Sequence, residues 1–552
     1  MKQMNRRLGL LFCFFSLLFL VALARSGWLQ GVRGGELRAE ARGQQVTEVE
    51  VPGLRGRVLD RNGEVLAVSE NAASVAATPY QVKDPERVAE LLSPILGVQE
   101  SEITEALGDG SAGFAYLARK VELSDAERVE KLGLAGIYTI PDSRRLYPQG
   151  ELAAQVIGAV GDENEGLTGL EQADEDVLGG DDGEQEIVHD AAGEPIQAET
   201  VEPARNGDDI RLTLDAAIQS QAEKAIAEAG ESYGAAGATA VVMKPRTSEV
   251  LAIANWPGFD PNDVGSAAED ELLNRATGFT YEPGSTFKAF TVAAALEQGL
   301  VRPGTTFDLD PSIEVADRVI KEAHPRPRVT LSVAEILAQS SNVGAITVGL
   351  ALGSESFDEW IRTFGFGEPT GIDYPAEEQG IVPELEEYSG STMGNLPIGQ
   401  GLSVTPVQMA AAYSAIANGG MLRSPRLVEE IDGEQAEQEG DAERVIGKRT
   451  AEQLRHMLEG VLAPGGTASE VTVPGYVLAG KTGTAQKAEN GHYSKTDYVA
   501  SFVGFAPADD PALLVCVVVD EPEYVHAGGA VAAPVFGEIA SFALPYLGVS
   551  PD

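Results

Sequence analysis

The longest uncharged apolar run in the chain covers residues 8–24, with basic residues ahead of it and Arg25 directly behind. A run of this length is just enough to cross a bilayer, and the basic residues ahead of it favour a cytoplasmic N-terminus. We therefore predict a cytoplasmic tail over residues 1–7, a membrane anchor over 8–24 and an extracytoplasmic remainder. Ala22-Leu23-Ala24 also fits a signal-peptidase site, so cleavage stays open, and either alternative exports the rest of the chain.

Short apolar segments separated by turn residues follow from about residue 48 to residue 203. Residues 58–61 and 64–67 flank Asn62-Gly63, a pair that predicts a two-residue hairpin turn. No nucleophile is paired with a base anywhere in this stretch. The pattern therefore indicates a non-catalytic α+β module.

The pattern changes near residue 207, where longer apolar runs begin. Asp215 is placed to cap a helix over residues 216–229. The later runs predict strands over 210–214, 238–243, 249–254, 499–505 and 513–519 and a closing helix over 532–544. Because strands come from both ends of this part and mostly helical sequence lies between them, we expect one antiparallel sheet flanked by helices.

The charge balance is strongly acidic, since 40 basic and 85 acidic residues leave a net charge of −45. Such a surface repels phosphate backbones, which argues against a nucleic-acid partner. With 552 residues, 43% of them hydrophobic, the chain can build several units with large cores. Its two cysteines, Cys13 and Cys516, lie in the apolar run and in a predicted strand, so we expect no disulfide between them.

A serine and a lysine stand at the start of a predicted helix. Pro283-Gly284 ends the preceding segment, and residues 289–298 form a helical run that stops at Gly299. Ser285 and Lys288 are three residues apart, so one helical turn brings them to the same face. A lysine of depressed pKa can activate a serine as nucleophile. Taken alone, however, this short pattern is more often a helix start followed by a surface lysine.

Two other motifs do not fit their sequence context. Residues 475–482 match the phosphate-binding loop pattern, but no helix follows to face a phosphate. Residues 230–234 match the nucleophile elbow of hydrolases, but they leave a predicted helix instead of a strand. The five histidines show no metal-ligand spacing, so we expect no metal site and no cofactor.

Two further elements turn the pair into a pattern of three. Ser340-Ser341-Asn342 follows a helical run, and Lys481-Thr482-Gly483-Thr484 lies in a strand-like run. S-x-x-K, S-x-N and K-T-G elements together are the signature of serine β-lactamases and penicillin-binding proteins. Their joint presence, in this order, makes a chance match at Ser285 improbable.

The residue types suit acyl transfer. Lys288 is expected to be neutral when it takes the Ser285 proton, because burial and the second cation Lys481 both lower its pKa. Ser340 can relay a proton to the leaving amine, and Asn342 can orient Lys288 and a substrate amide. We expect Lys481, Thr482 and Thr484 to hold a substrate carboxylate, Gly483 to let a substrate backbone approach, and the N–H groups of Ser285 and Thr484 to bind the oxyanion.

The chain resembles the class B penicillin-binding proteins over nearly its whole length. The first module carries segments similar to the family's pedestal motifs: Arg55–Gly63, Arg145–Pro148 and Gly166–Glu171. The second carries segments similar to its transpeptidase motifs: Tyr281–Lys288, Ser340–Gly344, Gly399–Gly401 and Lys481–Thr484. A β-lactamase has no pedestal, so the first set separates the two families.

The resemblance implies an α/β (α+β) fold: a penicillin-binding, β-lactamase-like transpeptidase domain over residues 206–552, preceded by an elongated pedestal over 25–205 and a single transmembrane helix. It implies D-Ala-D-Ala stem peptides of peptidoglycan as substrates, β-lactams as inhibitors, and a retained anchor in the cell membrane. Residues 255–263 (NWPGFDPND) look closer to the division-type subgroup. For that subgroup the partners would be a septal glycan polymerase and divisome membrane proteins.

Three alternatives stay open. The chain could be an elongation-type class B transpeptidase. It could be a β-lactamase or D,D-carboxypeptidase, since Glu384 and Glu386 stand roughly where a class A lactamase keeps its acid. It could also be an inactive divisome scaffold, although the complete set of motif residues argues against that.

Overall fold

The computed structural model describes residues 2–31, 33, 46–108, 112–189, 195–436, 442–489 and 492–551. Part of the predicted pedestal, residues 34–45, lies outside the described residues. The chain forms two compact units. Unit 1 comprises Met1–Leu54, Asn71–Arg144 and Gly180–Gly207, and unit 2 comprises Arg55–Glu70, Arg145–Gly179 and Asp208–Asp552.

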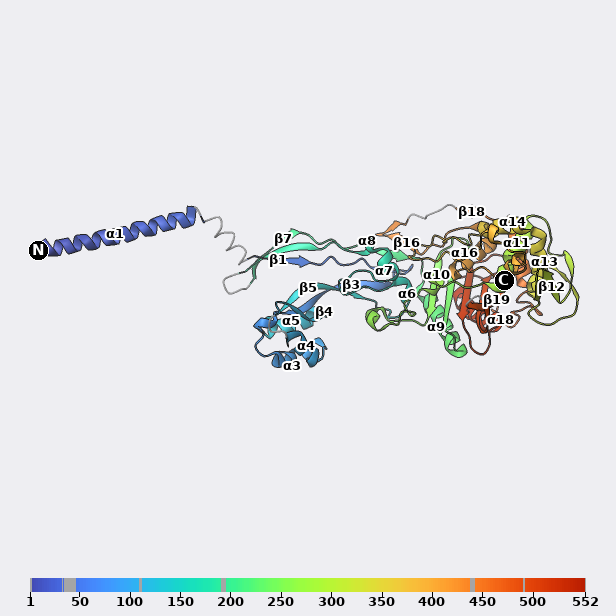
Figure 1. The fold of residues 1–552 in the computed structure, drawn as a ribbon, viewed down its shortest axis with the longest axis horizontal. Helices are drawn as coiled ribbons and strands as arrows, with labels where there is room; N and C mark the ends of the chain where they lie inside the picture. The colour runs from blue at the N-terminus through green and yellow to red at the C-terminus, as the bar shows by residue number, and fades with distance from the viewer. Residues whose placement is uncertain are drawn as a thin grey trace. The chain divides into compact units, whose positions relative to one another are not determined.

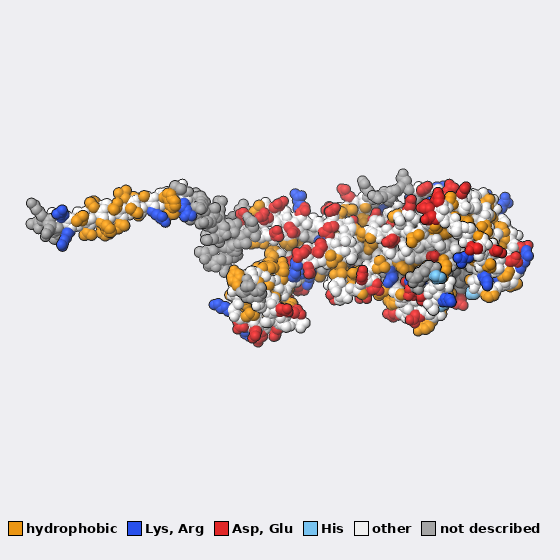
Figure 2. All heavy atoms as spheres, viewed as in Figure 1, with side chains coloured by type: hydrophobic (Ala, Val, Ile, Leu, Met, Phe, Trp, Pro, Cys, Tyr) orange, Lys and Arg blue, Asp and Glu red, His pale blue; other side chains and the backbone are white. Residues whose placement is uncertain are grey.

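The N-terminal helix α1 (Lys2–Gly31) is longer than the apolar run that predicts it. Its segment Asn5–Gly31 is strongly apolar, and the side chains of its most apolar window are not buried by the rest of the protein. Figure 2 shows hydrophobic side chains along the helix and basic ones towards both of its ends. Length and exposed apolar surface are those of a membrane-spanning helix. The less apolar α18 (Gly528–Tyr546) has 61% of its most apolar window buried and belongs to the core of unit 2.

Unit 1 contains two groups of elements. An antiparallel sheet has the strand order β1 (Val46–Val51), β6 (Gly183–His189) and β7 (Pro195–Glu202). In the other group, α3 (Pro85–Leu96), α4 (Glu100–Gly108) and α5 (Leu123–Lys131) gather around β4 (Ala115–Glu122) (Figure 1). A small core that includes Leu92 and Ile103 holds this second group together.

The centre of unit 2 is a five-stranded antiparallel sheet. Its strand order is β10 (Val250–Trp256), β9 (Gly237–Met243), β21 (Leu513–Asp520), β20 (His492–Ala506) and β19 (Ala479–Glu489). Strands from both ends of the domain therefore pair, as the apolar pattern predicts. Successive residues on a strand face opposite sides of a sheet, so a continuous apolar run such as residues 513–519 indicates burial on both faces.

Helices cover both faces of this sheet. The helices α9 (Ala216–Tyr233) and α18 pack on one face, where Val515 and Val517 join their core. The helix α16 (Pro406–Ala417) packs on the other face against β9 and β21, where Cys516 and Val518 join the larger core. The side chain of Asp215 caps α9 by accepting from the N–H groups of Ala217 and Ile218, as predicted. Both cysteines are free.

The predicted strand at 210–214 is shorter and lies in a different sheet. The strand β8 (Ile210–Leu212) pairs antiparallel with β16 (Val428–Ile431) and parallel with β2 (Val58–Leu59). The strand β2 pairs with β3 (Val65–Ala77), and a hairpin turn joins them. The loop has three residues, Arg61-Asn62-Gly63, and not the predicted two: Asp60 N donates to Glu64 O at 2.9 Å, and Gly63 lies in the left-handed region at φ +87°. Segments on both sides of residue 206 thus share one sheet within unit 2.

The three pedestal-type segments meet in a buried ion network inside unit 2. The Glu171 carboxylate is fully buried and accepts hydrogen bonds from Arg55 Nε at 3.0 Å and Arg145 Nε at 2.7 Å. Arg145 also donates to the Gly56 carbonyl at 2.7 Å, and Arg55 donates to Glu175 at 2.8 Å. These bonds tie residues 55–70 to residues 145–179.

The Glu171→Ala variant should be less stable to urea by about 3–5 kcal/mol, because two buried guanidinium groups lose their shared carboxylate. The matched control is Glu175→Ala. The Glu175 side chain is 45% exposed and accepts from Arg55 and from the Gly166 N–H at 2.8 Å, so its loss should cost less, about 1–2 kcal/mol. Equal losses of unfolding free energy in the two variants would contradict this account of the network.

Candidate active site

Ser285 lies in a short 3₁₀ turn, η3 (Gly284–Phe287), that leads directly into α11 (Lys288–Glu297). Thr286 stabilises the turn by donating its hydroxyl to the Pro283 carbonyl at 2.7 Å, while its own carbonyl accepts from the Tyr413 hydroxyl at 2.6 Å. Gly399 packs against the turn so closely that a side chain there would reach the Gly284 carbonyl oxygen at 2.2 Å. The hydroxyl of Ser285 makes no hydrogen bond to any described residue, and the side chain is partly exposed.

Lys288 begins α11 and is fully buried. Its ammonium donates to the Ser340 carbonyl at 2.7 Å, to the Ser340 hydroxyl at 3.3 Å and to Asn342 Oδ1 at 2.7 Å. Burial lowers the pKa of Lys288 to about 7, against the opposing attraction of the Glu322 carboxylate. A substantial fraction of Lys288 is therefore a neutral amine near neutral pH.

Ser340 owes its position to the end of a helix. The helix α12 (Val333–Ala338) ends in a Schellman motif, in which Ser340 N donates to Leu337 O and Ser341 N donates to Ile336 O. This motif places Ser340 at φ +58°, the left-handed region that non-glycine residues rarely occupy. Ser341 then caps α13 (Asn342–Leu352) by accepting from Gly344 N. One helix stop and one helix start thus place Ser340 and Asn342 beside Lys288.

Lys481 on β19 reaches the same hydroxyl from the opposite side. It is fully buried, and its ammonium donates to Ser340 Oγ at 3.0 Å and to the Thr482 carbonyl at 3.2 Å. Burial holds its pKa well below the usual range, and the neighbouring Lys288 adds to that shift. Two buried lysines of lowered pKa therefore share one serine hydroxyl, an arrangement suited to moving a proton.

The remaining predicted residues follow Lys481 along β19. The Thr482 hydroxyl bonds that of Thr467 at 2.7 Å, whereas Thr484 is exposed and accepts from Gly528 N at 3.0 Å. Gly483 packs closely against the Ser285 segment. A side chain there would meet Ser501 Oγ at 2.2 Å and Pro283 O at 2.9 Å.

Comparison with known proteins supports the family. Residues 238–541 match the penicillin binding protein transpeptidase domain, and residues 50–212 match the penicillin-binding protein dimerisation domain. The chain belongs to the class B penicillin-binding proteins.

Relatives of this penicillin-binding protein match over nearly its whole length. Stage V sporulation protein D of Bacillus subtilis is 36% identical over 99% of this chain and 86% of its own. Peptidoglycan D,D-transpeptidase FtsI of Escherichia coli is 31% identical over 96% of this chain and 90% of its own. The crystal structure of penicillin binding protein 3 from Mycobacterium tuberculosis complexed with aztreonam has a TM-score of 0.72 and 30% identity, covering 91% of this chain and 98% of that chain.

One residue of the site in this penicillin-binding protein could not be predicted from any sequence motif. Glu322 follows the hairpin of β12 (Ser312–Val315) and β13 (Arg318–Lys321), and its side chain is only 7% exposed. Its carboxylate accepts from the Ser341 hydroxyl at 2.6 Å and from Asn342 N at 2.7 Å, at the N-terminus of α13. A carboxylate is favourable at a helix N-terminus. Glu322 therefore positions Asn342, and its negative charge raises the pKa of Lys288.

The Glu322→Gln variant should acylate with penicillin about tenfold more slowly, because an amide offers one acceptor oxygen where the carboxylate offers two and Asn342 is held less firmly. Removing the negative charge should also lower the pKa of Lys288 further, so the midpoint of the acylation pH profile should move to lower pH. Stopped-flow acylation across pH measures both effects. The control is Glu314→Gln on the exposed side of the same hairpin. If acylation slows but the midpoint of its pH profile does not move, Glu322 has only a structural role.

The sequence contexts that argue against the two other motifs are confirmed. Residues 475–482 run into β19, with no helix behind them. Residues 230–234 form the C-terminal end of α9, where Gly234 takes a left-handed conformation. Neither segment has the geometry that its motif requires.

Proposed function

We propose that this chain is a serine-type peptidoglycan D,D-transpeptidase that cross-links stem peptides through an acyl-enzyme on Ser285. The observation that carries the proposal is that two buried lysines, Lys288 and Lys481, share the Ser340 hydroxyl. Lys288 begins the helix that directly follows the Ser285 turn. The names of relatives such as FtsI point to the same reaction.

In the acylation step, neutral Lys288 takes the proton of Ser285 while Oγ attacks the carbonyl carbon between the two D-alanines. The N–H groups of Ser285 and Thr484 stabilise the oxyanion, worth roughly 3 kcal/mol for each donor. As the C–N bond breaks, Ser340 passes a proton to the leaving D-alanine amine. Lys481, Thr482 and Thr484 bind the terminal carboxylate before it leaves.

In the second step, an amine of another stem peptide attacks the ester carbonyl. The new C–N bond forms, the bond to Ser285 Oγ breaks, and the proton of the amine returns to Oγ through the lysine and Ser340 pair. A β-lactam enters the first step in the same way. Its amine stays attached to the acyl group after the ring opens, which explains why a stable adduct is expected.

We further propose the setting of the reaction. The helix α1 would anchor the protein in the cell membrane with residues 1–7 in the cytoplasm, residues 25–205 would form the pedestal, and residues 206–552 would carry the chemistry outside. The similarity to FtsI favours a septal role, with a septal glycan polymerase and divisome membrane proteins as partners. Depletion should then give filaments, whereas rounded cells would indicate the elongation type.

The competing reactions have less support. Glu384 and Glu386, the candidate bases of a lactamase, are both exposed, and Glu384 accepts from Arg362 at 3.0 Å. A solvent-exposed carboxylate that is paired with an arginine is poorly suited to act as the base that activates water at Ser285. The complete hydrogen-bond set around Ser340 also argues against an inactive scaffold.

The test uses the full-length protein in detergent with a D-Ala-D-Ala stem peptide and a second peptide that carries a free amine. The proposal predicts D-alanine release together with a cross-linked peptide product. D-alanine release with hydrolysis alone would indicate a carboxypeptidase, and rapid turnover of penicillin would indicate a lactamase. Absence of both D-alanine release and a penicillin adduct would indicate a scaffold.

A further inference from the structure

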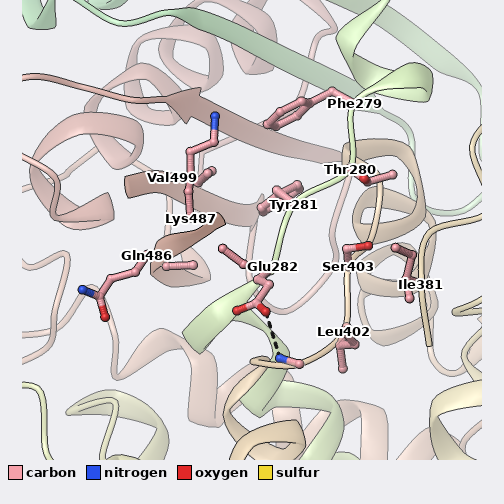
Figure 3. Close-up of a pocket in the computed structure, with 13 residues that line it drawn as sticks. Phe279, Thr280, Tyr281, Glu282, Ile381, Leu402, Ser403, Gln486, Lys487 and Val499 are labelled. Carbon is pink, nitrogen blue, oxygen red and sulfur yellow. Dashed lines mark hydrogen bonds between the residues drawn. The ribbon is translucent and has the colours of Figure 1, made fainter. Parts of the chain in front are cut away.

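A cavity of about 390 Å³ lies beside the Ser285 turn, within unit 2 (Figure 3). Its walls are residues 279–282, residues 401–403 and the part of β19 that follows Thr484. Glu282 precedes Ser285 by three residues, and Ala485 directly follows Thr484. The cavity therefore borders the Ser285 turn and the end of the Lys481–Thr484 segment, and the proposed mechanism does not use it.

The carboxylate of Glu282 is only half satisfied. Oε1 accepts from Gly401 N at 3.0 Å and from the Tyr493 hydroxyl at 3.2 Å. Oε2 is buried and has no hydrogen-bond partner among the described residues, and the same holds for Ser403 Oγ in the same cavity. Figure 3 shows one Glu282 oxygen bonded to the Gly401 nitrogen and the other directed away from it. An unpaired buried carboxylate oxygen is costly, and burial raises the pKa of Glu282 accordingly.

The one lysine that lines the cavity does not pair with the Glu282 carboxylate. Lys487 donates to Asp520 at 3.0 Å and to Glu521 at 2.5 Å, so its charge is already compensated. The other walls are largely apolar and include Phe279, Leu402 and Val499. The cavity thus combines an apolar lining with a single unsatisfied negative group, which suits a ligand with an aliphatic stem and a cationic end.

We propose that this cavity binds a primary ammonium group on a short aliphatic chain, with the ammonium paired to the Glu282 carboxylate and the chain along the apolar wall. The inference rests on the proposed function, because a stem peptide that bears an amine is the ligand the site would meet. The amine can come from two sources. It belongs either to the donor peptide, whose D-Ala-D-Ala end lies at Ser285, or to the acceptor peptide.

The test is calorimetric binding to the full-length protein in detergent, and it needs no turnover. Two peptides carry a lysine at the third stem position, one ending in D-Ala-D-Ala and one lacking both alanines, and each is compared with its Nε-acetyl form. The free amine should bind about tenfold more tightly than the acetylated one, since a charge-assisted hydrogen bond is lost on acetylation. A preference confined to the D-Ala-D-Ala peptide assigns the cavity to the donor, and one confined to the shorter peptide assigns it to the acceptor.

The variant Glu282→Gln keeps an oxygen for Gly401 N and the Tyr493 hydroxyl but removes the charge, so it should abolish the preference. The matched control Glu384→Gln, on an exposed glutamate outside the cavity, should keep it. Equal binding of free and acetylated peptides by the unmodified protein, or a preference that survives in Glu282→Gln, would overturn the inference. D-alanine release measured on the same samples separates the two proposals, because the transpeptidase reaction can fail while the preference persists, and the reverse.

Discussion

The Ser285→Ala variant should release D-alanine from a D-Ala-D-Ala peptide more slowly than the unmodified protein by a factor on the order of 10⁵ to 10⁶. The hydroxyl is the only atom of the site that forms the covalent intermediate in our mechanism, and neither lysine can replace it. Binding groups and oxyanion donors remain, so a small residual rate is expected. D-alanine release by the full-length protein in detergent measures the effect.

Folding offers the control for this variant. Because the Ser285 hydroxyl makes no hydrogen bond to any described residue, its removal should leave the thermal midpoint within about 2 °C of the unmodified value. A Ser285→Ala protein that keeps this midpoint and still forms a lasting penicillin adduct would show that another residue is the nucleophile.

The Lys288→Met variant should acylate with penicillin about 10³-fold more slowly, because the general base is lost while its volume is kept. The variant removes the cost of burying an ammonium group, but it also leaves Ser340 O and Asn342 Oδ1 without their donor. The net change in the free energy of unfolding should therefore be small. Stopped-flow acylation measures the rate. Lys495→Met, at an exposed lysine, is the matched control and should acylate at the unmodified rate.

The pH dependence of the acylation rate distinguishes a general base at Lys288 from a lysine with a purely structural role. Since burial lowers the pKa of Lys288 to about 7, the amine is protonated below that pH and neutral above it. Acylation by the unmodified protein should therefore rise as the pH increases through about 7, and the residual rate of Lys288→Met should lack this rise. A variant within tenfold of the unmodified rate, or one that keeps the same rise, would exclude Lys288 as the base.

The central sheet could be predicted because its signal is local. Runs such as residues 513–519 are apolar at consecutive positions, which only a strand covered on both faces tolerates at that length. The cap at Asp215 is likewise local. The motifs grouped Ser285, Lys288, Ser340 and Lys481. In the structure, hydrogen bonds to the Ser340 hydroxyl join the two lysines to Ser340, and Ser285 lies in the turn directly ahead of Lys288.

The parts that escaped prediction depend on contacts between distant segments. Nothing near Glu322 indicates that its carboxylate lies under Ser341 and Asn342, because a hairpin and a helix start must first meet. The left-handed Ser340 arises from a helix end for which glycine is the usual residue. The burial of Glu171 between Arg55 and Arg145 likewise joins three segments that are far apart in the sequence.

The most direct test of the proposed mechanism is the site of the covalent adduct. The full-length protein is incubated with benzylpenicillin, denatured and digested, and the modified peptide is sequenced by mass spectrometry. We predict one equivalent of ring-opened drug on Ser285. A stoichiometric adduct on any other residue, such as Ser340, or no adduct on a protein with unchanged folding, would contradict the assignment of Ser285 as the nucleophile.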